Sequence, residues 1–360
     1  MAIILYLFTL SSPNLLFVSI SLYQRRKILQ TLPSSISTIM VDRISNLSDE
    51  LLCHILSFIP TKLAFTTTVL SKRWTSLCYS LPVLDFEYGW EDSCYQFDRF
   101  CRNVDAVMLS PLSTNQPLQT FYLKCYLRDQ DHISRIFNAW IEAAKRRHVE
   151  EIILTLNFHI LNPTIFISRT LVVLKLKRIH VTIDTLCVDL PSLQTLHLKY
   201  VDFKNWNDYI NFLSFCPILL DLHAECIYIR SGMNLEEGLR SLTLSTLVRA
   251  SISSMDALFN GIDNVEFLRI ITRFGSTEAS LEAIPMFTNL THIELLFFYN
   301  SFHCWDGVVE LLRNCPNLQI LFITKVCKIK CLLVNFFSIY FDKCYFLSLD
   351  SGPRPTHPRN

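Results

Sequence analysis

The sequence predicts an α/β fold in which a small helical module is followed by a solenoid, a curved parallel sheet whose strands are joined by irregular helical or loop returns. Two patterns predict it. Apolar residues between positions 47 and 59 recur with the spacing of an α-helix. From position 83 onward, a short apolar pattern typical of strands returns about every 20 to 30 residues. The chain of 360 residues exceeds the roughly 150 residues of an average domain, so it is long enough for both parts.

The helical module is predicted from one stretch of apolar residues and its boundary signals. Ser48 is suited to cap the helix N-terminus, and Asp49 and Glu50 place negative charge at the positive end of the helix dipole. Pro60 closes the segment. A second apolar set predicts one or two further helices through residue 79; its members are Leu63, Val69, Leu70, Trp74 and Leu77.

This stretch, ISNLSDELLCHILSFIPTKLAFTTTVLSKRWTSL, resembles an F-box. The resemblance is carried by the LxDELLxxILSFIP opening and the VLSKRW close, which lie at the expected separation. Two departures stand out. Ser48 occupies a position where the family usually has proline, and Thr66, Thr67 and Thr68 replace a more acidic or apolar stretch. Because serine also caps helices well, the helical fold is expected to survive the first change.

The resemblance implies that the module docks on a Skp-type adaptor, which links it to a cullin scaffold. Such a contact places leucine and isoleucine anchors of a helix in a groove of the partner. The residues predicted to bind the adaptor are Leu47, Leu51, Leu52, Ile55, Leu56, Leu70 and Trp74. The alternative is that some of these side chains, in particular Leu70 and Trp74, only hold the helices of this small module together.

The solenoid is predicted from a pattern of leucines at positions 1, 4 and 6 of a short unit. The clear copies are Leu171-Leu174-Leu176, Leu193-Leu196-Leu198, Leu219-Leu222-Ala224 and Leu318-Leu321-Ile323, and weaker ones start at Leu118, Val149, Leu239, Val265 and Leu290. Periods of this length are typical of leucine-rich repeats. One repeat leaves its apolar face uncovered, so repeats stack and bury that face together.

The F-box and the irregular repeats together resemble the plant F-box/LRR group, whose members often carry a further C-terminal FBD-type domain. The sequence departs from the repeat pattern after Lys325, so no FBD domain is assigned. The predicted organisation is an N-terminal extension (1–39), an F-box (40–82), leucine-rich repeats (83–326) and an atypical C-terminal tail (327–360).

Both ends of the chain differ from its middle. Residues 3–23 are apolar and precede a basic run at 24–27, which suits a membrane anchor, but residues 11–14 interrupt the span. Two interpretations stay open: an anchor, or a leader ahead of a natural start at Met40. The tail after Lys325 has no clear period, and it suits a final strand or helix as well as the product of a retained intron.

The variable positions between the leucines are expected to face the concave side of the sheet. The predicted substrate-binding residues there are Lys175, His197, Lys199, Asp221, His223, Phe267, Arg269 and Phe322. The same positions include Lys177, Glu225, Ile271, Glu294, Leu296 and Thr324. Charged members are expected to set the register of a bound protein, and aromatic members to supply buried area. The alternative is that all of them are ordinary solvated strand residues.

Composition argues against several other classes of function. Lys and Arg number 33 and Asp and Glu 32, so the net charge of +1 gives no field that attracts nucleic acid, and no nucleic-acid partner is expected. The seven glycines form no GxG motif or phosphate-binding loop, so no cofactor is predicted.

The thirteen cysteines indicate reduced thiols rather than disulfides or a metal centre. No CxxC motif occurs, and structural zinc sites usually need two such close pairs, so no metal ligands are predicted. Mostly buried thiols fit the cytoplasm or the nucleus, with a membrane location only if residues 3–23 are an anchor. Cys216 and Cys315, each followed by proline ahead of a strand unit, are expected in the core or in turns.

No catalytic residues are predicted, because the ten histidines are scattered and no nucleophile and base form a known local signature. The enzymatic alternative is a metal or hydrolytic site around His197, His223, Asp221 and Cys226. The resemblance implies instead a non-enzymatic substrate-recognition adaptor of a Skp-cullin-F-box (SCF) ubiquitin ligase, which binds an unidentified target protein. The alternatives are an F-box protein that acts outside any ligase and a membrane-anchored LRR interaction protein.

Overall fold

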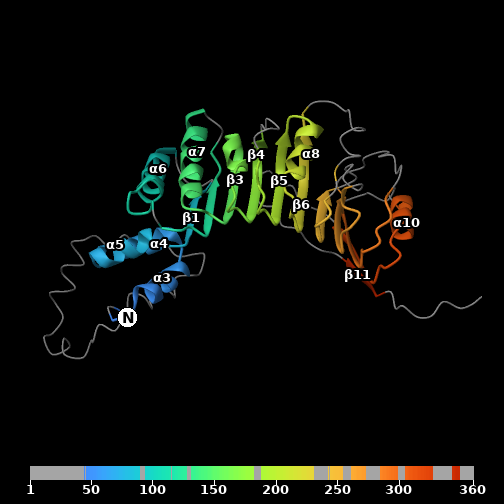
Figure 1. Cartoon of the computed structure of the whole chain (residues 1–360), viewed down its shortest axis with the longest axis horizontal. Helices are drawn as coiled ribbons and strands as arrows, with labels where there is room; N and C mark the ends of the chain where they lie inside the picture. Colours follow the sequence, from blue (N-terminus) through green and yellow to red (C-terminus); the bar gives the residue numbers. More distant parts are fainter. Residues whose placement is uncertain are drawn as a thin grey trace, which may run out of the picture. The chain divides into compact units, whose positions relative to one another are not determined.

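The computed structural model describes residues 44, 46–89, 94–114, 116–127, 131–181, 188–230, 242, 244–253, 261–272, 284–298, 305–326 and 343–348. It divides into two units, Met1–Phe58 and Ile59–Asn360, and Figure 1 labels many of their helices and strands. Residues 1–39, including the proposed anchor at 3–23, lie outside the described residues, as does most of the tail. Within the described residues, none of the helices combines the length and the apolar character needed to cross a bilayer.

The first unit contains one described helix, α3 (Asp49–Ser57). The second unit contains the short helices α4 (Thr61–Thr66), η1 (Thr67–Val69) and α5 (Lys72–Tyr79), and then the sheet with its connecting helices. The strands are β1 (Val83–Tyr88), β2 (Thr120–Cys125), β3 (Glu151–Ile160), β4 (Val173–Val181), β5 (Thr195–Phe203), β6 (Asp221–Ile229), β7 (Arg249–Ser253), β8 (Phe267–Thr272), β9 (His292–Phe298), β10 (Ile320–Val326) and β11 (Lys343–Ser348). The connecting helices are α6 (Cys94–Met108), α7 (Asp131–Arg146), η2 (Pro163–Phe166), α8 (Trp206–Ser214) and α10 (Trp305–Arg313).

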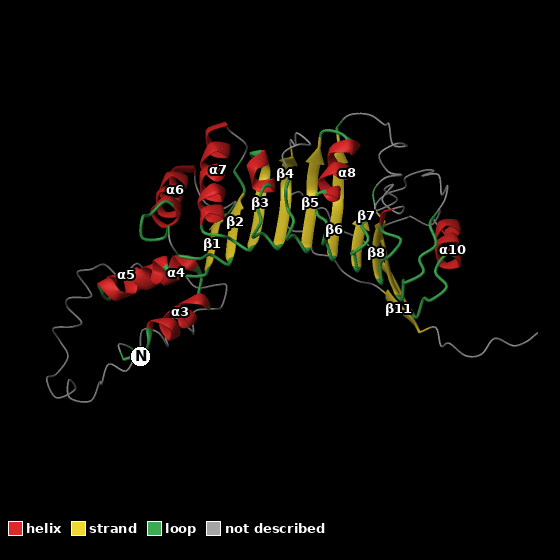
Figure 2. Cartoon of the chain, in the orientation of Figure 1, coloured by secondary structure: helices red, strands yellow, loops and turns green. Residues whose placement is uncertain are grey.

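The strands form one open sheet in which spatial order equals chain order (Figure 2). Strands β1 to β10 run parallel, each paired with its neighbour in sequence, and β11 pairs antiparallel with β10. The equivalent leucines of successive repeats lie opposite one another: Leu174 pairs with Leu196, and Leu196 with Leu222. This register confirms the predicted solenoid of leucine-rich repeats.

One face of the sheet holds the core. Leu174, Leu196 and Leu222 are fully buried, as expected for the inward positions of an alternating strand pattern. Aromatic side chains of the connecting helices are buried with them, for example Phe212 of α8, whose ring meets Phe203 of β5. Each buried leucine contributes roughly 1.5 to 3 kcal/mol relative to exposure, so the repeated leucine rows dominate the stability of this unit.

The repeat pattern holds with one change. The copy predicted at Leu239 lies outside the described residues, and strand β7 belongs instead to a unit that begins at Leu247. Ala250 takes the place of the second leucine in that unit, so the unit does not show the leucine pattern in its sequence. Cys216 and Cys315 are buried just ahead of β6 and β10, as expected, and burial raises the pKa of the Cys216 thiol to about 12.

Four consecutive strands, β3 to β6, carry a residue in the left-handed region at the same place. Phe158, Arg178, Tyr200 and Cys226 have φ values of 59°, 56°, 55° and 56°. Pairing skips these positions, and the buried face moves from even to odd residue numbers beyond Arg178. The recurring bulge therefore keeps apolar side chains facing the core at the C-terminal ends of these strands. It has a local energetic cost, because the left-handed conformation disfavours a non-glycine residue by roughly 1 to 2 kcal/mol.

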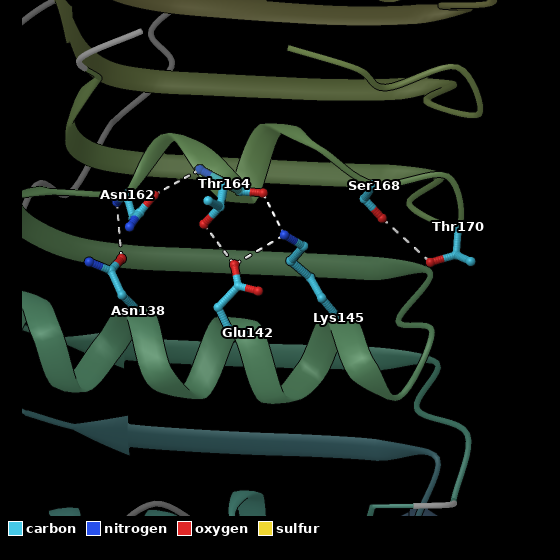
Figure 3. Close-up of polar contacts among 7 residues, drawn as sticks. All are labelled: Asn138, Glu142, Lys145, Asn162, Thr164, Ser168 and Thr170. Carbon is cyan, nitrogen blue, oxygen red and sulfur yellow. Dashed lines mark hydrogen bonds and ion pairs between the residues drawn. The ribbon is translucent and has the colours of Figure 1, made fainter. Parts of the chain in front are cut away.

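Polar contacts attach α7 to the next return segment (Figure 3). Glu142 Oε1 accepts hydrogen bonds from Thr164 Oγ1 at 2.7 Å and from Lys145 Nζ at 3.0 Å, and Lys145 Nζ also donates to the Thr164 carbonyl at 2.6 Å. One turn away, Asn138 Oδ1 accepts from the Asn162 backbone N–H at 3.0 Å. These contacts join helix α7 to the return segment at η2, so they hold one repeat against the next.

The Glu142 contacts predict a pH dependence. Burial acts to raise the pKa of the Glu142 carboxyl, but the hydrogen bonds from Thr164 and Lys145 outweigh it and hold the pKa below its ordinary value. The folded state therefore favours the charged carboxylate. Its stabilisation is complete above the unfolded pKa of about 4.3 and is lost as the pH falls through the lowered folded pKa. Glu142→Gln should reduce the acid sensitivity of thermal unfolding below about pH 4.3, measured as melting temperature against pH.

Glu310→Gln provides the control for that experiment, because it removes the carboxylate of an exposed pair with Arg313 (3.2 Å) in α10. An acid profile changed equally by both substitutions would contradict the role given to Glu142.

Candidate functional site

The predicted adaptor-binding residues of α3 divide into a buried and an exposed group. The Ser48 side chain accepts a hydrogen bond from the Leu51 N–H at 3.4 Å, which confirms the predicted cap. Leu52 and Leu56 are buried, whereas Leu51 remains 44% exposed. Leu47 and Ile55 are half-buried.

Phe58, just beyond α3, was not among the predicted residues and is 68% exposed. It follows Leu51 by seven residues, about two helical turns, so the spacing was the signal that sequence reasoning passed over. The His54 ring meets the Phe58 ring edge-on at 4.8 Å. Leu51 and Phe58 are the large apolar side chains that the first unit leaves in solvent within its described part.

The second unit holds the other two predicted adaptor contacts. Leu70 is 52% exposed and its neighbour Val69 is more exposed still, while Trp74 is buried within the chain. Trp74 therefore contributes to packing, in line with the structural alternative, and Leu70 is available to a partner.

The Asp85 carboxylate connects helix α4 of this unit to the sheet through hydrogen bonds. Asp85 Oδ1 of β1 accepts from both the backbone N–H and the hydroxyl of Thr61 at 2.5 Å, and the Asp85 N–H donates back to Thr61 Oγ1 at 2.8 Å. Thr61 itself is buried. The contact holds the start of α4 against the first strand.

The face of the sheet opposite the leucine rows, called here the open face, carries the predicted substrate-binding residues. Several of its charged side chains form ion pairs with a side chain of a neighbouring strand. Lys175 Nζ lies 2.9 Å from Glu151 of the preceding strand, and Arg249 Nε lies 3.2 Å from Asp221 of the preceding strand. Lys199 is ion-paired with Glu225 of the following strand.

Two histidines meet at the middle of the open face. The rings of His197 and His223 are 5.3 Å apart, and each has an acidic neighbour: Asp221 lies 3.9 Å from His197 and Glu225 lies 3.4 Å from His223. Burial and then the nearby His223 lower the pKa of His197, although Asp221 acts in the opposite direction. The structure thus brings together His197, His223 and Asp221 in a lateral network of ion pairs and ring contacts.

An aromatic cluster lies further along the same face. His292 of β9 is placed between Phe267 of β8, with ring centroids 4.7 Å apart, and Phe322 of β10, with centroids 5.7 Å apart. Arg269 Nε lies 3.5 Å from Glu294. The two predicted aromatic anchors therefore share one cluster through His292, a link that the sequence did not reveal.

Four other residues expected on this face are largely buried: Glu225, Ile271, Leu296 and Thr324. Ile271 pairs with Leu296, which in turn pairs with Thr324, so these side chains lie in one row across neighbouring strands. Side chains opposite one another in a sheet are close enough to cover each other, and Glu225 is covered between Lys199 and His223.

Comparison with known proteins supports both parts of this architecture. Residues 44–86 match the F-box domain family, and residues 192–217 match the leucine-rich-repeat family. A putative F-box/LRR-repeat protein of Arabidopsis thaliana is 28% identical, over 78% of this chain and 71% of its own length. A putative F-box protein of the same plant is 30% identical, over 78% of this chain and 73% of its own length.

A shorter match points to the same group. An F-box/FBD/LRR-repeat protein of Arabidopsis thaliana is 37% identical, over 50% of this chain and 40% of its own length. With an F-box match at the helical module, repeats in register along one parallel sheet, and relatives of this type along most of its length, the chain belongs to the plant F-box/LRR-repeat proteins.

Proposed function

We propose that this protein is the substrate-recognition adaptor of an SCF-type ubiquitin ligase. The F-box docks on a Skp-type adaptor, and through it on cullin, while the open face of the repeats binds a target protein. The observation that carries the docking half is the exposed apolar pair of Leu51 and Phe58 on the F-box segment. F-box/LRR families are generally non-catalytic, and we propose the same for this chain, located in the cytoplasm or the nucleus.

The energetics favour a partner at Leu51 and Phe58. Covering a large apolar side chain is worth roughly 1.5 to 3 kcal/mol, and neither residue gains it within the first unit. A short helix that presents apolar side chains suits insertion into a hydrophobic groove. The chain would then raise the concentration of its target near the ubiquitin donor, which requires no catalytic group of its own.

Leu51→Asp is expected to weaken binding of a Skp-type adaptor at least about 30-fold, because charging one central anchor of a groove contact costs roughly 2 kcal/mol or more. Titration of the purified full chain with the adaptor, followed by calorimetry, measures this. Since Leu51 is exposed in the free chain, the helix content seen by circular dichroism should not change.

Leu112→Asp is the matched control: Leu112 is equally a leucine in solvent, in the turn that follows α6, and its replacement should leave adaptor binding intact. Equal affinities of Leu51→Asp and the unmodified chain would refute the docking surface. Cullin should co-purify from plant cells with the unmodified chain and not with Leu51→Asp. Adaptor recovered without cullin would instead indicate action outside a ligase.

A further inference from the structure

We propose that the open face over strands β2 to β5 binds a short anionic stretch of a protein at a cluster of cations, called here the basic patch and formed by Lys124, Lys177, Arg178 and Lys199. The inference rests on the proposed function in one respect, namely that the open face receives a target protein. It adds the chemical class of the segment that is bound.

Register places these cations side by side. Lys177 of β4 is directly opposite Lys199 of β5, and on its other side Lys177 is opposite Thr155, which is opposite Lys124 of β2. Adjacent strands are about 4.8 Å apart, and like charges directly opposite one another destabilise a sheet. The fold therefore keeps three lysines in one row despite their mutual repulsion.

The ends of the row are neutralised and its middle is not. Lys124 is ion-paired with Glu87, and Lys199 with Glu225. Lys177 makes no ion pair with any described residue. Burial, followed by the charges of Lys199 and Arg178, lowers the pKa of Lys177, and Glu225 only partly opposes this. An anion that reached Lys177 would meet a cation that forms no ion pair with any residue the structure describes.

Arg178 supplies a second cation. Its guanidinium lies 5.9 Å from the ring centre of Tyr126, and Lys124 Nζ lies 5.4 Å from the same ring. Such cation–π contacts hold a charged group in place without neutralising it. No described carboxylate pairs with Arg178. Arg178 directly follows Lys177 in β4 and has a left-handed backbone conformation. The two adjacent cations therefore both lack an ion-pair partner among the described residues.

The arrangement fits a peptide better than a nucleic acid. From Lys124 to Lys199 the row crosses three strand spacings, about 14 Å, which an extended peptide covers in roughly four or five residues. Glu87, Glu151 and Glu225 flank the cations. A nucleic acid strand would bring its regularly spaced phosphates against these carboxylates, whereas a short peptide with two or three anionic side chains can contact the cations alone.

The test uses the full chain in complex with a Skp-type adaptor and fluorescent ten-residue peptides that differ only in a central block. The blocks are five glutamates, five glutamines, and three phosphoserines separated by glycines. Anisotropy should show the anionic peptides binding at least about tenfold more tightly than the glutamine peptide, with affinity falling as salt rises. The stronger of the two anionic peptides identifies carboxylate or phosphate as the preferred group.

Lys177→Glu should reduce binding of both anionic peptides at least about tenfold. Arg169→Glu, the same charge reversal at an exposed site before β4, should reduce it less than about twofold. Lys177→Gln should also weaken binding while leaving the melting temperature equal or higher, because it relieves the repulsion from Lys199; this separates loss of binding from loss of folding.

The inference is overturned if the glutamine peptide binds as tightly as the anionic ones, if both charge reversals act equally, or if a single-stranded oligonucleotide of matched charge binds more tightly than the peptides. Each of these results leaves docking on the adaptor untouched. Failure of the proposed function would show separately, in the experiment with Leu51→Asp.

Discussion

Replacing Trp140 by alanine is expected to lower the free energy of unfolding of the second unit by about 3 to 5 kcal/mol, the usual cost of deleting a buried tryptophan. Trp140 of α7 is fully buried, its ring lies 6.0 Å from that of Phe100 and 5.6 Å from that of Phe137, and Nε1 donates to Asp105 Oδ1 at 2.7 Å. The substitution removes both the ring and the donor between α6 and α7. Urea denaturation followed by circular dichroism measures the change.

Trp140→Phe is the companion variant, because it retains most of the apolar volume and loses the indole N–H. A cost clearly below that of alanine would show that packing dominates, while equal costs would assign the effect to the bond with Asp105. A change under about 1 kcal/mol for Trp140→Ala would contradict the complete burial of the Trp140 side chain.

Replacing Asp85 by alanine should cost about 2 to 4 kcal/mol. Two donors of the buried Thr61, its N–H and its hydroxyl, lose their common acceptor, and a buried donor left without one costs roughly 1 to 3 kcal/mol. Since this carboxylate joins the start of α4 to β1, amide exchange should accelerate in α4 more than in β5 or β6.

Asp85→Asn keeps one acceptor oxygen in place and should recover at least half of the loss. Thr61→Val, which removes the hydroxyl alone, should be milder than Asp85→Ala for the same reason. Exchange that accelerates uniformly along the sheet in Asp85→Ala would contradict a local role for this contact.

The repeat architecture followed from sequence because its leucines are also its buried residues. Leu174, Leu196 and Leu222 occupy equivalent places in their units, and each is fully buried. The unit at Leu247 could not be predicted from the leucine pattern, because Ala250 fills the same inward position with a smaller side chain. A pattern search weighs residue type, whereas burial depends on position in the strand.

The lateral pairing of the open face could not be predicted in the same way. Lys175 and Lys177 look alike in sequence, but Lys175 meets Glu151 whereas Lys177 faces Lys199. Those neighbours come from other strands, and the register between strands depends on the lengths and conformations of the returns. Sequence therefore indicated which residues share the face, and the structure showed which of them are already neutralised.

In the F-box, too, the sequence predicted the helical face but not which of its side chains are buried. A helical face was evident from the spacing of Leu51, Leu52, Ile55 and Leu56, but spacing alone did not show that Leu51 stays in solvent while Leu52 and Leu56 are buried. That distinction decides which substitutions test partner binding and which only test folding.

The order of the sheet has a consequence for how the second unit responds to damage and to change. Because each strand that the structure describes pairs only with the strands before and after it in the chain, energetic coupling is confined to adjacent repeats, as in a one-dimensional array. A weakened repeat should loosen its two neighbours and leave distant ones protected. Gain or loss of one whole repeat would lengthen or shorten the open face by a single strand spacing, and the strand order of the other repeats would stay the same. Variation in repeat number is therefore a route by which such a protein changes the reach of its binding surface without redesigning its core.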